Sequence, residues 1–419
     1  MKMHFVISSA GTSGDILPFI EMGKSLLKRK HDVSVIVNPY FEGVLQSAGL
    51  PLVPFGTAEQ AQDLFNDPGL WNQRTGFHLL WKKTIQPNTH SIRTHIQSLS
   101  GDRRVVVLTH PAVMALADLA RADRSDIRIV VVYQYPTIIR TFSGKKTLNG
   151  LNLPTRPALI RKALYSLTDR FVDAGILPGL NQERQKLGLA PMKHFFPHIQ
   201  SSADLYVTLF PEWFAPAEPD YPKPLIQGNF VLPASAQGTL SEELIRFLDA
   251  GQPPFLFSPG TENLHAGAFF EIAMDAVRSM NGRAIMVTKL REQLPSSLPD
   301  FVLWQKYVPF DAILPRVAVL VHHGGIGSVA IASKIGVRQL VVPFAYDQFD
   351  NARLVKDLGL GDSIPIRSLT PSRLCTSLRE ITDSAAVQES CRKVAARFAS
   401  GPPIDTIMDQ VVSAVEGNG

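Results

Sequence analysis

The stretch His322-His323-Gly324-Gly325-Ile326-Gly327-Ser328 lies between two segments of regular pattern. The apolar run 317–321 before it predicts a buried strand, and the segment 329–334 after it predicts a helix. Glycines allow a ligand to approach the backbone closely, and the unpaired N–H groups at a helix start attract anions. A strand, a glycine-rich turn and a helix in this order therefore predict an anion site, with His323 and Ser328 within reach of a phosphate. His322 is ambiguous, because alternation at a strand end would point its side chain elsewhere.

A second polar group follows the next predicted strand, 339–342. Pro343 ends that strand, and Asp347-Gln348-Phe349-Asp350-Asn351-Ala352 comes soon after. The carboxylate of Asp347 and the amide of Gln348 are suited to hydrogen bonds with sugar hydroxyls. One site of this kind would hold a diphosphate and the sugar attached to it. Two plainer interpretations remain open: a Rossmann phosphate turn for another nucleotide, and an ordinary helix N-terminus with an acidic first turn.

The ordered pattern from His323 to Asn351 resembles the donor-binding signature of the family 1 nucleotide-sugar glycosyltransferases. This family includes plant and antibiotic glycosyltransferases, and it has the GT-B fold of two facing Rossmann-like domains with a cleft between them. The glycine-rich form at Ile326-Gly327 is similar to the bacterial branch. The resemblance implies that His323 donates to the distal phosphate and that Ser328 both caps the helix and touches the other phosphate. The donor-binding residues that it implies in this signature are His323, Gly325, Gly327, Ser328, Asp347 and Gln348.

Two further segments belong to the donor site that the resemblance implies. Pro259-Gly260-Thr261 stands where the family has a small loop near the diphosphate. Gly260 would permit close approach, and Thr261 would donate from its N–H and hydroxyl groups. Val308, within Tyr307-Val308-Pro309, stands where the family contacts the nucleobase through the backbone. A plain surface turn is the alternative at 259–261.

The first predicted strand, 5–7, is followed by the turn Ser8 to Pro18. This turn resembles the N-terminal loop of antibiotic and lipid glycosyltransferases. The resemblance implies that Asp15 is the catalytic base, which takes the proton of the acceptor hydroxyl as that hydroxyl attacks the anomeric carbon. Gly14 beside it is assigned to the donor site. Burial would raise the basicity of an aspartate, whose ordinary pKa is about 4. The alternative is that Asp15 only caps a helix beginning near Pro18.

We expect no metal ion and no cofactor. The second half lacks an Asp-x-Asp pair, and the histidines lack zinc spacing. The charge of the leaving diphosphate is expected to be met by His323, backbone N–H groups and the helix dipole. A UDP- or dTDP-sugar would be the co-substrate. The family resemblance implies inversion at the anomeric carbon by direct displacement.

The 419 residues exceed what one hydrophobic core supports, and strand-like and helix-like segments alternate in both halves. The fold class is therefore α/β. We predict an N-terminal acceptor-binding domain over 1–215, a C-terminal nucleotide-sugar-binding domain over 216–402, and a last helix, 403–419, that returns to the first domain. Two cysteines, Cys375 and Cys391, are too few for a disulfide framework, so a cytoplasmic protein is expected.

The net charge of +5 is modest, and no nucleic acid motif is present, so no nucleic acid partner is expected. The segment 71–100 carries four basic residues and no acidic one, with aromatic side chains among them. One interpretation is peripheral contact with the inner membrane face or with an amphiphilic anionic ligand; the other is inward packing of the aromatic side chains. Both remain open. The residues assigned to acceptor binding are Trp71, Phe77, Trp81 and His110.

Further segments resemble the rhamnosyltransferases of rhamnolipid synthesis, including Asp67-Pro68-Gly69-Leu70-Trp71 and Leu209 to Pro216. The resemblance implies transfer from dTDP-rhamnose or UDP-glucose to a small hydrophobic acceptor such as a hydroxy-fatty-acid lipid. Sterol, carotenoid and phenolic acceptors are the alternatives, because related sequences act on them. Two other classes stay open, namely a nucleotide-sugar epimerase and a non-catalytic binding protein.

Overall fold

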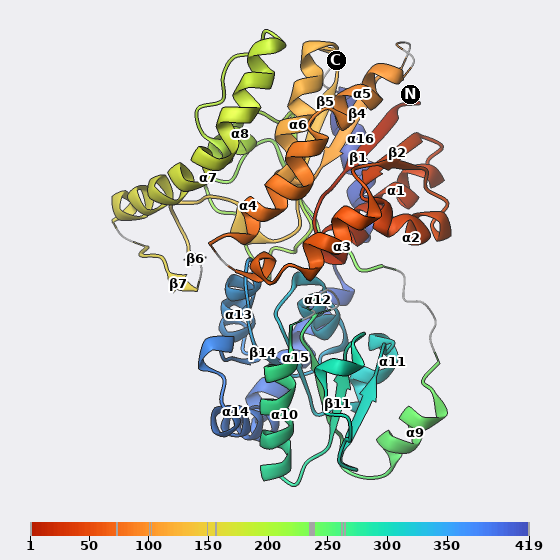
Figure 1. Ribbon diagram of the computed structural model, residues 1–419, viewed down its shortest axis with the longest axis vertical. Coiled ribbons are helices and arrows are strands. Elements are labelled where there is room, and N and C mark those ends of the chain that lie inside the picture. The colour runs from red at the N-terminus through yellow and green to blue at the C-terminus, as the bar shows by residue number, and fades with distance from the viewer. Residues whose placement is uncertain are drawn as a thin grey trace. The chain divides into compact units, whose positions relative to one another are not determined.

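A computed structural model describes residues 2–72, 74–99, 101, 103–148, 150–155, 157–233, 239–260, 263 and 265–417. Contacts divide the chain into unit 1, Met1–Pro233 with Pro402–Gly419, and unit 2, Ala234–Gly401. Each unit is built around one parallel sheet with helices packed on it (Figure 1). This confirms the predicted α/β class with two Rossmann-like halves.

The sheet of unit 1 has seven parallel strands in the order β3-β2-β1-β4-β5-β8-β9. Their bounds are β1 His4–Ser8, β2 Asp32–Val37, β3 Leu52–Pro54, β4 Val105–Thr109, β5 Arg128–Tyr133, β8 Leu205–Thr208 and β9 Leu225–Gln227. All five residues of β4, Val-Val-Val-Leu-Thr, are buried. An unbroken apolar run is what a parallel strand covered on both faces requires. A short antiparallel pair, β6 Thr147–Leu148 and β7 Leu151–Asn152, stands apart from this sheet.

The last helix of the chain belongs to unit 1 and packs on α1 (Figure 1, blue on red). Ser25 Oγ donates to Asp405 Oδ1 at 2.5 Å, and Arg29 Nε donates to Asp409 Oδ1 at 2.6 Å. The helices of this unit are α1 Ser13–Lys28, α2 Glu42–Ser47, α3 Ala58–Asn66, α4 Gly76–Leu80, α5 Ser91–Ser98, α6 Met114–Asp118, α7 Ala158–Lys186, α8 Phe195–Ser201 and α16 Ile404–Gly417. The predicted ranges 1–215, 216–402 and 403–419 stay predictions, and β9, within 216–233, pairs with β8 of unit 1.

Unit 2 contains six parallel strands in the order β12-β11-β10-β13-β14-β15. Their bounds are β10 Phe255–Ser258, β11 Ala284–Val287, β12 Val302–Gln305, β13 Val319–His322, β14 Gln339–Val341 and β15 Gly361–Ser363. The helices are α9 Glu242–Asp249, α10 Gly267–Ser279, α11 Phe310–Ile313, α12 Ile326–Ile335, α13 Gln348–Asp357, α14 Pro371–Asp383 and α15 Ala385–Ala399. The side chains of α10 and α14 join those of the strands in one apolar core, which includes Phe257, Phe269 and Leu378.

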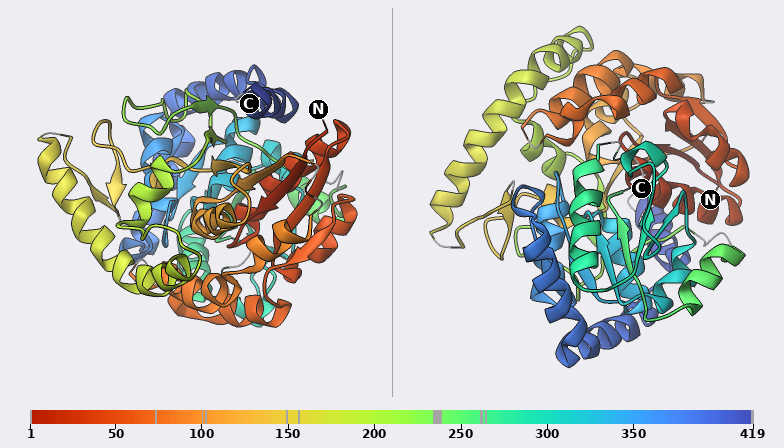
Figure 2. Two further views of the ribbon diagram at one scale, coloured as in Figure 1. Left: turned by 90° about the horizontal axis from the view of Figure 1, so that it is seen from above. Right: turned by 60° about the horizontal axis from the view of Figure 1, so that its bottom comes forward.

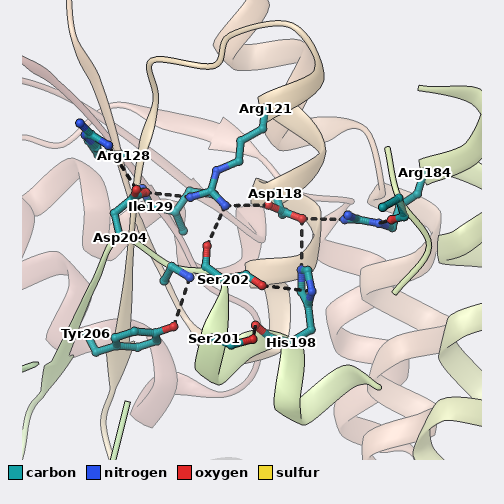
Figure 3. Close-up of polar contacts among 12 residues, drawn as sticks. Asp118, Arg121, Arg128, Ile129, Arg184, His198, Ser201, Ser202, Asp204 and Tyr206 are labelled. Carbon is teal, nitrogen blue, oxygen red and sulfur yellow. Dashed lines mark hydrogen bonds and ion pairs between the residues drawn. The ribbon is translucent and has the colours of Figure 1, made fainter. Parts of the chain in front are cut away.

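A buried charge network in unit 1 centres on Asp118, the last residue of α6 (Figure 3). Its carboxylate accepts from Arg184 Nη1 at 2.6 Å and Arg121 Nη1 at 3.0 Å, and it lies 3.1 Å from His198 Nε2. His198 Nδ1 is 3.1 Å from Ser202 Oγ. Although this order of hydroxyl, imidazole and carboxylate occurs in hydrolases, two guanidinium groups hold the carboxylate here. The network joins α6, α7 and α8, so we assign it to stability.

The Asp118→Asn variant should lose about 2–4 kcal/mol of unfolding free energy at pH 7. Burial alone would raise the pKa of Asp118, but hydrogen bonds from His198 and Arg184 outweigh it and lower the pKa to about 2. The ionised carboxylate thus stabilises the fold fully above about pH 4, and this contribution fades as the pH falls toward 2. Urea unfolding of the wild type and the variant at pH 7 and at pH 3 measures the difference in unfolding free energy at each pH. The control Asp275→Asn, in an exposed pair with Arg278, should cost under about 1 kcal/mol; equal losses in the two variants would contradict the assignment.

Candidate functional site

The side chain of His323 lies between two glycines that come from different segments of unit 2. A Cβ on Gly260 would stand 3.1 Å from Cε1 of His323, and a Cβ on Gly325 would stand 2.4 Å from its Nε2. The two segments meet because β10 and β13 pair in parallel, with Ser258 opposite His322. Gly260 also has φ of +106°, which favours glycine. The carboxyl ends of two neighbouring strands therefore enclose one imidazole.

His323 is electrically neutral at pH 7. Burial lowers its pKa to about 4, although a hydrogen bond to the backbone of Ser258 acts in the opposite direction. A neutral imidazole carries a single N–H without a full charge, and a phosphate receives that N–H only in exchange for the Ser258 backbone. In the free protein, His323 would therefore contribute an oriented hydrogen bond to an anion site, and not a positive charge.

The helix α12 begins at Ile326, three residues earlier than predicted, and its N-cap is Gly325. The backbone oxygen of Gly325 accepts from the N–H groups of Ser328 at 3.0 Å and Val329 at 3.1 Å. The predicted capping role of Ser328 is therefore wrong, because Ser328 is the third residue of the helix. The N–H groups of Ile326 and Gly327 lie in the first turn, where the helix supplies no acceptor. Gly327 is exposed, and a Cβ there would have nothing within 4 Å.

His322 holds the turn from inside. Gly324 N donates to its Nδ1 at 3.2 Å, and its Nε2 lies 3.2 Å from Gln339 Oε1. Burial lowers the pKa of His322 to about 3. Both ring nitrogens of His322 have protein partners and its side chain is fully buried, so His322 supports the turn. Of the two histidines, only His323 lies against Gly260 and Gly325.

The segment predicted to bind the sugar is tied to the glycine-rich turn 322–328 through Asn351. Its Nδ2 donates to Asp347 Oδ2 at 2.6 Å and to the backbone oxygen of Gly324 at 2.9 Å. Asp347 is the N-cap residue of α13. Gln348 is buried, and its Oε1 accepts from the N–H groups of Phe344 at 2.8 Å and Ala345 at 3.0 Å. Its amide oxygen therefore orders the loop before α13, and the predicted contact of Gln348 with a sugar is left to the amide nitrogen.

The structure leaves the two remaining donor-site predictions untested. Val308 is buried between β12 and α11, and its backbone contact with the nucleobase stays a prediction. Thr261 lies outside the described residues. Its neighbour Gly260 is the part of that loop that the structure places against His323.

Asp15 lies in the first turn of α1 in unit 1. Thr12 donates to its Oδ2 from N at 2.8 Å and from Oγ1 at 3.1 Å, as in a capping box. The helix thus begins at Ser13, earlier than the predicted start near Pro18, and the capping alternative describes part of what Asp15 does. Burial raises the pKa of Asp15 to about 6 against the lowering effect of Thr12, while 20% of the side chain stays exposed. The carboxylate is therefore a stronger base than an ordinary aspartate and is mostly ionised at pH 7. Gly14 beside it is exposed.

His110 lies beside Asp15, because it follows β4, which pairs with β1. Its Nε2 is 3.8 Å from Asp15 Oδ1 and 3.5 Å from the hydroxyl of Tyr135. Ala112 N donates to its Nδ1 at 3.2 Å, and burial lowers its pKa to about 3. The neutral ring therefore carries its proton on Nε2 and presents it toward the carboxylate. This neighbour of Asp15 was not foreseen, since the sequence assigned His110 to acceptor binding alone.

The aromatic side chains of the predicted acceptor segment pack largely inward. The ring of Trp81 is buried 5.6 Å from that of Phe195, and Phe77 lies 5.9 Å from the same ring. Trp71, the last residue of the short helix Pro68–Trp71, is half-buried. Lys83 pairs with Asp67 at 2.7 Å. Of the two interpretations left open, inward packing describes Phe77 and Trp81; their contact with an acceptor stays a prediction.

Within the described residues, no group of three or more His, Cys, Asp or Glu is placed to hold a metal ion. The same part of the chain contains no helix with the length and apolar character that crossing a membrane requires.

Comparisons with known proteins agree with this architecture. Residues 271–414, which include the His323 turn, match the family described as erythromycin biosynthesis protein CIII-like, C-terminal domain. Vancomycin aglycone glucosyltransferase of Amycolatopsis orientalis is 24% identical over 408 residues, covering 92% of each chain. Sterol 3-beta-glucosyltransferase UGT80B1 of Arabidopsis thaliana is 24% identical over 90% of this chain, and this chain spans only 63% of its length.

Solved structures show the same fold over the full length. CalG4, the calicheamicin glycosyltransferase, superimposes with a TM-score of 0.70 at 19% identity, covering 100% of this chain and 99% of its own. The spinosyn rhamnosyltransferase SpnG, complexed with thymidine diphosphate, has a TM-score of 0.67 at 15% identity, covering 98% and 99%. The chain therefore shares its fold, with both parallel sheets, with these solved structures.

Proposed function

Because the chain belongs to the family 1 nucleotide-sugar glycosyltransferases with the GT-B fold, we propose that it moves a hexose or deoxyhexose from a UDP- or dTDP-sugar to a hydroxyl group of a small hydrophobic acceptor. The observation that carries this proposal is the enclosure of His323 by Gly260 and Gly325 at the start of α12. A donor N–H, a glycine-lined approach and a helix N-terminus together suit a diphosphate.

On the donor side, the leaving diphosphate gains negative charge as its bond to the anomeric carbon breaks. The N–H of His323 and the first-turn N–H groups of α12 are fixed before the reaction, so they stabilise that charge without rearrangement. Asp347 and Gln348 are assigned to the sugar ring, and Asn351 holds Asp347 against the phosphate turn. The backbone of Val308 is assigned to the nucleobase.

On the acceptor side, Asp15 takes the proton of the acceptor hydroxyl. The hydroxyl oxygen forms a bond to the anomeric carbon, the bond from that carbon to the diphosphate oxygen breaks, and the nucleoside diphosphate leaves with the electron pair. A single displacement of this kind inverts the anomeric centre. The raised pKa of Asp15, caused by burial, supports the role because a base near the working pH transfers protons most effectively.

The acceptor we favour is a hydroxy-fatty-acid lipid, with dTDP-rhamnose as the donor. The resemblance of Asp67–Trp71 and Leu209–Pro216 to rhamnolipid rhamnosyltransferases supports this choice. A sterol or a phenolic natural product is the second candidate, favoured by the sterol and vancomycin aglycone relatives. We place the enzyme in the cytoplasm, since Cys375 and Cys391 are buried free thiols.

Release of nucleotide diphosphate tests the proposal directly. The protein should turn over at least one of UDP-glucose, dTDP-glucose and dTDP-rhamnose with a hydroxylated lipid, and mass spectrometry with NMR should find the glycoside with inverted configuration. Turnover with flavonoids but not with lipids would reject the lipid acceptor and keep the transferase. Conversion of the donor alone to another sugar would indicate an epimerase, and binding without any turnover would indicate a binding protein.

A further inference from the structure

The first half of α7 presents large apolar side chains to solvent. Their exposed fractions reach 75% at Leu159 and 66% at Leu167. Four of them, Ile160, Leu164, Leu167 and Phe171, recur three or four residues apart, so they lie on one side of the helix, and Leu159 flanks that side. The residues that form this surface, which we call the α7 outer face, are Leu159, Ile160, Leu164, Leu167 and Phe171. Figure 2 shows α7, in yellow-green, along the periphery of unit 1.

The opposite side of this first half of α7 is buried and largely polar. Arg161 is fully buried and donates to the backbone oxygens of Pro154 at 3.0 Å and Gly144 at 2.7 Å. Asp169 accepts from Arg140 Nη2 at 2.8 Å. An ordinary surface helix has the reverse arrangement, with its apolar side on the core. The α7 outer face therefore contributes little to the packing of unit 1, apart from Phe171, whose ring lies against that of His78.

The exposed charged side chains in the segment that contains this surface are basic. Among the described residues of 142–182, the exposed charged side chains are Lys145, Lys162 and Arg170. The acidic residues of the segment, Asp169 and Asp173, are buried and bonded to Arg140 and to His194. Beyond the segment, the carboxylate of Asp220 is bonded to Phe142 N and Ser143 Oγ at the base of the β6–β7 pair.

We propose that the α7 outer face docks on the interface of a bilayer that contains anionic lipids. The apolar face extends about 18 Å along the helix and has Arg170 at its border, an arrangement that suits shallow insertion between headgroups. No described helix is long and apolar enough to span a membrane, so the contact would be peripheral. The membrane contact predicted for 71–100 thereby moves to α7, since Phe77 and Trp81 pack inward and His78 of α4 lies against Phe171, 4.7 Å between ring centroids.

Co-sedimentation with phosphatidylcholine vesicles, with and without phosphatidylglycerol, tests this surface. The wild type should sediment with the anionic vesicles, and Leu164→Ser/Leu167→Ser/Phe171→Ser should lower its partition coefficient about 10-fold or more. The matched control, Val44→Ser/Ile245→Ser, removes exposed apolar side chains elsewhere and should bind like the wild type. Circular dichroism melting of each variant separates lost binding from lost folding.

The charge arm uses Arg170→Gln, which should reduce the preference for phosphatidylglycerol about 5-fold. Arg379→Gln/Lys393→Gln, exposed on α14 and α15, is its control. The proposal is overturned if the wild type stays in the supernatant or if the triple serine variant sediments with vesicles as the wild type does. It is also overturned if the wild type is a lipid-independent dimer that the triple variant converts to a monomer, since that would assign the face to a second copy. None of these outcomes depends on glycosyl transfer.

Discussion

Replacement of Asp15 by asparagine should lower kcat about 10²–10⁴-fold and leave the affinity for UDP or dTDP unchanged. Asparagine keeps an oxygen that accepts from Thr12 N, so α1 retains its first turn, but an amide takes no proton from an acceptor. In the wild type, kcat/KM should fall as the pH drops below about 6, because burial raises the pKa of Asp15 to about 6. Steady-state kinetics across pH and calorimetric titration with nucleotide measure the two quantities.

The same variant should be more stable than the wild type above pH 6. The pKa of Asp15 is about 6 in the folded chain and 3.8 unperturbed, so folding prefers the protonated form. Protonated Asp15 therefore contributes stability to the fold. This contribution is fully present below about pH 4 and is lost as the pH rises through 6. The uncharged asparagine side chain avoids this loss, and the free energy of unfolding should rise by about 1–3 kcal/mol at pH 8. The gain should vanish near pH 3.

A purely capping Asp15 would give the opposite pattern, with kcat intact and about 1 kcal/mol of stability lost. The capping box of α3 provides the matched control. Gln60→Ala removes the side chain that accepts from Thr57 N at 3.1 Å, and it should lower stability slightly without changing kcat. Normal turnover by the Asp15→Asn variant would remove Asp15 from the mechanism.

The second large effect is expected for His323→Ala, which should lower kcat about 10²–10³-fold and weaken dTDP or UDP binding. In the proposed mechanism the neutral imidazole supplies one oriented N–H to the diphosphate, and alanine supplies none. The loss should be larger in kcat than in affinity, because negative charge on the diphosphate grows as the bond to the sugar breaks. Product formation and fluorescence titration with nucleotide separate the two.

His90→Ala is the matched control for this substitution. His90 lies at the surface of unit 1, with Nε2 3.1 Å from Glu183, and its replacement should change neither quantity. Gly325→Ala approaches the site differently, because its Cβ would stand 2.4 Å from His323 Nε2 and displace the ring. It should reproduce much of the His323→Ala defect while keeping the imidazole. Unaltered nucleotide binding in both variants would place the diphosphate elsewhere.

The apolar runs of the sequence predicted the central strands of both sheets. The predicted strands 5–7, 317–321 and 339–342, for example, overlap β1, β13 and β14. Three edge strands were missed, namely β3, β9 and β15, each of three residues. The residues of β15 are Gly361-Asp362-Ser363, which lack any apolar side chain. Only the hydrogen bonds to β14 make this segment a strand, and such pairing leaves no local pattern.

The candidate site divides in the same way. The glycine-rich turn at His323 could be recognised from the sequence, because the residues that define it are neighbours along the chain. The support of Asp347 by Asn351, and the approach of His110 to Asp15, depend on side chains from different strands or turns. Such pairs follow from strand order and register, which the one-dimensional pattern does not contain. Helix starts were also misplaced, since Thr12 with Asp15 and the N-cap Gly325 begin α1 and α12 earlier than apolar spacing suggested.

The position of α16 has a practical consequence for engineering. Ile407, Met408, Val411 and Val415 are buried, and Arg104 Nη1 donates to the backbone oxygen of Val415 at 2.6 Å. A chain cut after Gly401 would strip this cover from α1, the helix whose first turn contains Asp15, although every residue of unit 2 would still be present. Truncation at the carboxyl terminus should therefore damage proton transfer to the base more than recognition of the nucleotide.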